Sequence, residues 1–159
     1  MLLVAPAPFT LRHLNELVKR MRFNRLLGIR VTRRHRDGVT IECSVRDEFR
    51  NLAGVLHGGV SATLVDAAVG IAISNHFRGT RQATTVELKL NYFLPIEEGH
   101  VTARSRLIRV GSTLVVGRVD LYDMKKRLAG AALVTYMLLP VTETPSSAKR
   151  QTPTPGSPK

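Results

Sequence analysis

The sequence predicts an α+β fold in which a long antiparallel β-sheet wraps around one central apolar helix. Residues 58 to 75 form an alanine-rich apolar stretch with a single charge, as expected of a helix that is buried on several sides. Alternating strand patterns occupy 29 to 45 and 83 to 139, and the short breaks within them favour antiparallel neighbours. A sheet folded around one helix buries the apolar stretch and accounts for the order of the elements.

The chain begins with an amphipathic pattern that predicts a helix over residues 10 to 27. Apolar residues recur there at helical spacing, Thr10 is a suitable N-cap, and basic residues gather toward the C-terminal end. Gly28 follows as a helix stop.

A β-hairpin is predicted next. Residues 29 to 35 and 39 to 45 alternate as strands do, and Asp37-Gly38 stands between them as a hairpin turn signal. Residues 46 to 56 are expected to form a loop.

Four strands are predicted after the apolar helix, with short breaks between them, so that consecutive strands are expected to be antiparallel neighbours. They cover residues 83 to 93, 100 to 110, 113 to 123 and 127 to 139.

The 159 residues suggest one folded domain, which we place at residues 1 to 141. The segment from 142 to 159 holds four of the eight prolines and almost no apolar residues, and is expected to be a disordered tail. No transmembrane helix or signal peptide is expected, and Cys43 is the only cysteine, so that no intrachain disulfide can form. We therefore expect a cytoplasmic protein without a membrane partner.

The formal net charge of +12 favours polyanionic partners, either nucleic acid or a phosphorylated ligand. The basic residues are scattered, with the densest group at 30 to 36, only 5% of residues are aromatic, and tryptophan is absent. This composition disfavours single-strand binding by base stacking, and nucleic acid is not the expected partner.

The start of the apolar helix carries the first candidate site. Gly58 and Gly59 place backbone N–H groups at a helix N-terminus, where the helix dipole adds positive potential. Because glycine has no side chain, a ligand can approach these groups closely. Such groups can polarise an acyl carbonyl oxygen. The pair can equally be a turn that only starts the helix.

Asp66 is the single charge on the apolar helix. A carboxylate in such a place is costly to bury unless it is paired, and is often a tuned acid, base or nucleophile. It can also be a structural residue at the edge of the helix. Two polar side chains lie near the glycines: His57, for which we favour a loop-holding role over a general-base role, and Asn51, which can also be a turn former.

Gly58 and Asp66 are eight residues apart, which is about 12 Å along a helix. A carboxylate that acts on a carbonyl held by Gly58 must come within about 3 Å of the reacting atoms. If both residues are catalytic, the active unit is therefore a dimer in which each site combines Gly58 of one subunit with Asp66 of the other.

These residues also carry a resemblance to a known family. One run resembles the signature of hotdog-fold acyl-CoA thioesterases: Asn51…Gly54…His57-Gly58-Gly59…Leu64-Val65-Asp66. The subgroup it resembles is the phenylacetate-pathway (PaaI-like) type, which includes the thioesterase superfamily member enzymes. The segment from Thr85 to Pro95 resembles the strand that follows the helix in that family, and the element order matches from about residue 10 to 140.

The resemblance implies a role for each candidate catalytic residue. Asp66 is implied as nucleophile or general base across a dimer interface, and the Gly58 N–H as the group that polarises the thioester carbonyl. Asn51 is implied to position the attacking water or the thioester, and His57 to orient the loop and contact the thioester.

The resemblance also implies substrate-binding residues. Thr85 is expected to help hold the nucleophilic water, and Tyr92 and Pro95 to line a coenzyme A channel. Arg109 and Gly111 are candidate contacts for the coenzyme A phosphates. The resemblance further implies homodimers that pair into homotetramers. No cofactor is expected beyond the coenzyme A of the substrate, and the five histidines are not spaced as a metal site.

Three other functions compete with thioester hydrolysis. A non-catalytic acyl-CoA binder would not need Asn51, His57, Gly58 and Asp66 together. A dehydratase of the same fold places an Asp and a His close together on a different motif, which is absent here. Nucleic-acid binding would depend on the net charge alone.

Overall fold

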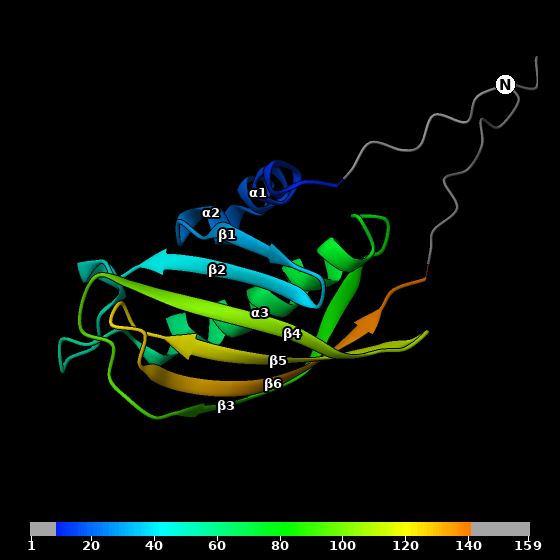
Figure 1. Ribbon diagram of the computed structural model, residues 1–159. Helices are drawn as coiled ribbons and strands as arrows, with labels where there is room; N and C mark the ends of the chain where they lie inside the picture. Colours follow the sequence, from blue (N-terminus) through cyan, green and yellow to red (C-terminus); the bar gives the residue numbers. More distant parts are fainter. Residues whose placement is uncertain (1–8, 141–159) are drawn as a thin grey trace, which may run out of the picture.

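The computed structural model describes residues 9–140, which form one antiparallel sheet wrapped around a long helix (Figure 1). The sheet has six strands in the order β1-β2-β4-β5-β6-β3, and every neighbouring pair is antiparallel. The elements are α1 (Leu11–Arg20), α2 (Arg22–Leu26), β1 (Arg30–His35), β2 (Gly38–Ser44), a 3₁₀ turn (Asp47–Phe49), α3 (Gly58–His76), β3 (Ala83–Tyr92), β4 (His100–Val110), β5 (Leu114–Tyr122) and β6 (Leu128–Leu138). The predicted α+β hotdog fold is confirmed. The predicted tail, 142 to 159, lies outside the described residues.

The first predicted helix is two helices. Thr10 caps α1 as expected, but Met21 takes an extended conformation and separates α1 from α2. After this break, Asn24 and Leu27 are both buried. Gly28 then ends the segment in the left-handed region with φ +68°, as a helix stop commonly does.

The β1–β2 hairpin is present, but its glycine has a different role from the predicted one. His35 pairs with Gly38, so the turn residues are Arg36 and Asp37, and Gly38 is the first residue of β2. A Cβ at position 38 would overlap the main-chain carbonyl oxygen of Ser105 on β4. Gly38 is therefore required for the close approach of β4 rather than for the turn.

Helix α3 lies against the concave face of the sheet, where Figure 1 shows it crossing behind β2, β4 and β5. Among the described residues it is the one helix long and apolar enough to cross a membrane, yet half of its most apolar stretch is buried in this fold, as in a core helix. A Cβ on Gly117 of β5 would lie 2.7 Å from Cγ2 of Val69, so this glycine sets how closely the helix approaches the sheet.

Strand β3 lies at the edge of the sheet, beside β6 and away from β4. The expectation that consecutive strands are neighbours holds for β4–β5 and β5–β6 but is wrong for β3–β4. The far side of β4 is occupied by β2, so the chain between β3 and β4 crosses the end of the sheet instead of forming a hairpin. The outer edge of β3 is consequently open.

Candidate active site

The N-terminus of α3 presents one backbone N–H group that has no partner. His57 is the N-cap, and its Nδ1 accepts a hydrogen bond of 2.9 Å from the Gly59 N–H. Within residues 9–140, the Gly58 N–H has no hydrogen-bond acceptor. The expectation of two unpaired glycine N–H groups is thus wrong for Gly59, whose N–H is used by the cap, while the Gly58 N–H is free to bind a ligand.

His57 holds the helix start in place. Its ring accepts through Nδ1, so in the neutral form the ring proton lies on Nε2. Its backbone N–H donates to the Phe49 carbonyl at 2.8 Å, which ties the start of α3 to the preceding loop. The geometry favours the loop-holding role over that of a general base.

Asn51 organises the loop that precedes the helix. Its side-chain Oδ1 accepts hydrogen bonds from the backbone N–H groups of Ala53 and Val55, and its main chain is bonded to Val55 and Gly54. This arrangement is that of a turn-forming asparagine. The Nδ2 group has no partner among the described residues and remains able to donate to a ligand.

A pocket of about 490 Å³ opens beside the Gly58 amide and is lined by three of the six predicted binding residues, Gly59, Tyr92 and Pro95. Tyr92 reaches over it from the end of β3 and donates from its hydroxyl to the Gly58 carbonyl oxygen at 2.8 Å. The pocket is also lined by Asn51, which is likewise a residue predicted for the site.

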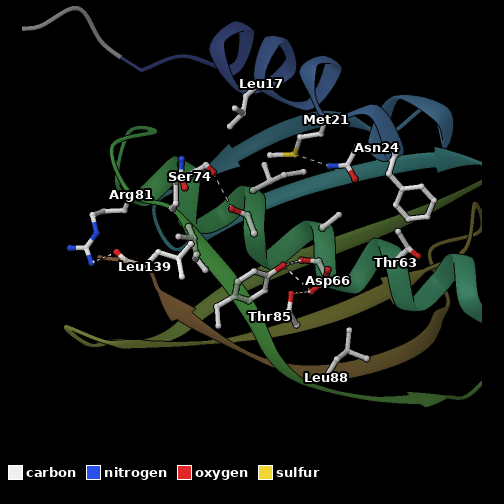
Figure 2. A pocket seen from close by; sticks show the side chains of 18 of the residues that line it. Leu17, Met21, Asn24, Thr63, Asp66, Ser74, Arg81, Thr85, Leu88 and Leu139 are labelled. Atoms are coloured by element: carbon white, nitrogen blue, oxygen red, sulfur yellow. Dashed lines mark hydrogen bonds between the residues drawn. The ribbon is translucent and has the colours of Figure 1, made fainter. Parts of the chain in front are cut away.

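Asp66 lies about two turns further along α3, where two hydroxyl groups hold its carboxylate (Figure 2). Thr85 on β3 donates to Asp66 Oδ1 at 2.8 Å. Tyr136 on β6 shares its hydroxyl proton between the same oxygen at 2.8 Å and the Asp66 carbonyl oxygen at 2.9 Å. The structure therefore brings the predicted residues Asp66 and Thr85 together.

Tyr136 was not recognised from the sequence as a functional residue. Its ring is 6% exposed, and burial together with the nearby negative charge of Asp66 raises the pKa of its phenol, so the hydroxyl stays protonated. The strand alternation of residues 127 to 139 could have indicated it, because a tyrosine on the inward face needs a partner for its hydroxyl.

Asp66 borders an apolar cavity of about 820 Å³ between α1, α2, α3 and β3. Figure 2 shows Leu17 and Met21 above this cavity and Asp66 and Thr85 below it. The volume falls in the range of small-molecule sites.

The cavity beside Asp66 and the pocket beside Gly58 share no lining residue. Gly58 and Asp66 of one chain therefore do not face one common pocket, in keeping with their separation of about 12 Å along the helix.

Arg109 and Gly111 lie apart from both pockets of their own chain. Arg109 pairs with Val116, and Gly111 lies in the β4–β5 turn, whereas the Gly58 pocket is reached from the other end of β5 at Leu121. Among residues 9–140, no group of three or more His, Cys, Asp or Glu side chains is placed to hold a metal ion.

Comparisons with known proteins place this site within a family of hydrolases. A sequence model described as the thioesterase superfamily matches residues 53–129, which include Gly58, Asp66 and Thr85. A Saccharolobus solfataricus protein provisionally named as an esterase is 30% identical over 124 residues, which are 78% of this chain and 82% of the relative.

Two further relatives are thioesterases by name. The medium/long-chain acyl-CoA thioesterase YigI of Escherichia coli is 28% identical over 143 residues and is matched over 76% of this chain and 88% of its own length. The crystal structure of the thioesterase HI1161 from Haemophilus influenzae superposes with a TM-score of 0.79 at 25% identity, covering 91% of this chain and 100% of that one.

Proposed function

Because this chain belongs to the thioesterase superfamily and is a thioester hydrolase, we propose that it hydrolyses acyl-CoA as a homodimer with shared active sites. Gly58 of one subunit binds the thioester carbonyl oxygen, and Asp66 of the other subunit supplies the carboxylate. The products are the free acid and coenzyme A, and the reaction needs no further cofactor.

The Gly58 amide supports the proposed oxyanion site. Its N–H lies at the first position of a 19-residue helix and has no acceptor within residues 9–140. A thioester carbonyl gains negative charge when it is attacked, and a donor that is already oriented stabilises this charge without reorganisation. The helix dipole acts in the same direction.

The observation that carries the shared site is the way in which α3 is tied to β3. Asp66 is bonded to Thr85 near the start of β3, and Gly58 is bonded to Tyr92 at its end. If the open edges of two β3 strands pair antiparallel in the register centred between residues 88 and 89, Thr85 of one subunit lies opposite Tyr92 of the other. Asp66 is then carried toward the Gly58 amide of the partner subunit.

The surface of β3 agrees with such pairing. Val86 and Tyr92 are each 57% exposed in the single chain, which leaves apolar area at an unpaired sheet edge. Pairing of this edge would cover both the backbone groups and part of this area. Association of two such dimers into a tetramer remains part of the proposal.

The substrate fits the two pockets and the charge of the chain. The acyl chain occupies the apolar cavity beside Asp66, and the coenzyme A portion lies across the pocket of Tyr92 and Pro95. The net charge of +12 attracts the phosphates of coenzyme A, for which Arg109 is a candidate contact if the subunits of the assembly bring it near. Asp66 acts either as nucleophile or as the base that activates water.

The direct test is release of free thiol from acyl-CoAs of increasing chain length by the wild-type protein and by Asp66→Ala. We expect turnover by the wild type and none by the variant. The variant should fold, because the Tyr136 hydroxyl keeps the main-chain carbonyl oxygen of residue 66 as an acceptor. Binding of acyl-CoA without turnover by the wild type would instead indicate a binding protein.

A further inference from the structure

The Asp66 carboxylate is held at one oxygen only. Oδ1 accepts the Thr85 hydroxyl and the Tyr136 hydroxyl, each at 2.8 Å, whereas Oδ2 has no hydrogen bond within residues 9–140. The one buried side-chain nitrogen or oxygen there that lacks a partner is Nε of Arg81, so Oδ2 is not enclosed and remains accessible from the cavity.

We propose that Tyr136 is a positioning residue which, together with Thr85, holds Oδ1 of Asp66 and leaves Oδ2 as the oxygen that reacts. This inference rests on the proposed function, in which Asp66 acts on the thioester. Oδ2 then either attacks the thioester carbon, which breaks the C–S bond, releases the coenzyme A thiolate and leaves a mixed anhydride that water hydrolyses, or it accepts a proton from the water that attacks this carbon. In the second route the C–S bond breaks and the proton passes to the leaving thiolate.

The contacts of Tyr136 explain why this residue can hold the carboxylate accurately. Tyr136 is only 6% exposed, and its backbone pairs with Val115 on β5 and with Thr85 on β3. Its hydroxyl also bonds to the main-chain carbonyl of Asp66, so it is fixed relative to the helix backbone as well as to the side chain. A hydroxyl anchored in this way limits rotation of the carboxylate about its Cβ–Cγ bond.

The hydroxyl is a permanent donor. Burial and the charge of Asp66 raise the pKa of the Tyr136 phenol, so it does not lose its proton at the pH at which the enzyme works. Thr85 has no acidic proton in this range either. Both donors therefore act on Oδ1 throughout, and the unbound Oδ2 keeps its lone pairs for the reaction.

The first test is steady-state hydrolysis of an acyl-CoA by Tyr136→Phe, which removes the hydroxyl and keeps the ring. A hydrogen bond to a charged group contributes enough that kcat should fall roughly tenfold to hundredfold, with KM unchanged within about twofold. Tyr122→Phe is the matched control, because the Tyr122 hydroxyl has no partner among the described residues and Tyr122 lines neither pocket. It should keep wild-type kcat.

A second test separates positioning from a purely structural role. Tyr136→Phe and Thr85→Val act on the same oxygen, so the double variant should lose less than the product of the two single losses. A kcat for Tyr136→Phe within twofold of wild type, or a loss in the double variant equal to the product of the two single losses, would overturn the inference.

Gly70→Ala provides an independent variant should Tyr136→Phe fail to fold. A Cβ at position 70 would lie 3.0 Å from the Tyr136 hydroxyl and must displace it by a few tenths of an ångström. Alanine also favours the helix, so stability is retained. A severalfold loss of kcat at unchanged melting temperature supports the positioning role, and unchanged kcat refutes it.

Different results would refute the proposed function and the proposed role of Tyr136. If wild-type protein turns over no acyl-CoA, or if Asp66→Ala retains wild-type turnover, the proposed function itself is wrong. If wild type is active and Asp66→Ala is inactive while Tyr136→Phe and Gly70→Ala are both normal, only the role of Tyr136 is wrong.

Discussion

The oxyanion role of Gly58 can be tested by a substitution that removes its backbone N–H group. Gly58→Pro removes the N–H at a position where the fold tolerates proline. Residue 58 is the first of α3, where proline is favoured and its N–H is not needed by the helix. His57 has φ −60° and ψ 134°, which is the conformation preferred by a residue that precedes proline.

Gly58→Ala is the matched control for this variant. Both substitutions add a Cβ, which would lie 3.2 Å from the Tyr92 hydroxyl oxygen. Tyr92 is 57% exposed, so its side chain can move by the few tenths of an ångström that this contact requires. Alanine keeps the N–H and proline lacks it, so the difference between the two variants reports on that group.

Loss of a single oxyanion donor lowers kcat by about a hundredfold to a thousandfold. We therefore expect Gly58→Pro to be slower than Gly58→Ala by this factor, with similar melting temperatures. The assay is thiol release from one acyl-CoA at saturating concentration, with the secondary structure of each variant checked by circular dichroism. Equal kcat values for the two folded variants would refute the assignment of the Gly58 N–H as the oxyanion donor.

Three further predictions concern assembly, packing and pH. Dimers formed at random from equal amounts of Asp66→Ala and Gly58→Pro chains should recover roughly one quarter of wild-type activity, because half are mixed and each mixed dimer has one intact site; no recovery in purified mixed dimers would exclude the shared site. Gly117→Ala should destabilise the fold by about 1–3 kcal/mol in chemical denaturation, since its Cβ would lie 2.7 Å from Val69 Cγ2, and an unchanged denaturation midpoint would contradict this packing. Burial, followed by the neighbouring arginines, lowers the pKa of His35 from 6.5, so the unfolded chain binds the proton more readily and stability falls as the pH drops below 6.5 and through the folded pKa. His35→Gln should show a smaller loss of melting temperature between pH 8 and pH 5, and an identical loss would refute this linkage.

Much of the fold follows from local patterns. The apolar helix, the hairpin, the strands and the Thr10 cap are all present, because side-chain periodicity and capping residues act over a few neighbouring positions. The break at Met21 could not be predicted in this way, since it depends on how Asn24 and Leu27 meet the core. The pairing of β3 with β6 also depends on which strand edges are already occupied.

The sequence by itself indicated the family, through the resemblance of its motif, and predicted the buried helix. It also marked Gly58 and Asp66 as candidate site residues, because a glycine pair before an apolar helix and a single acid within that helix can be recognised from neighbouring positions alone. Only the tertiary structure decided which amide is free, that Asn51 holds its own loop, and that Tyr136 and Thr85 converge on one carboxylate oxygen. Hydrogen bonds between residues 66 and 136 depend on how β6 and α3 are placed in space, and no spacing along the chain encodes that placement.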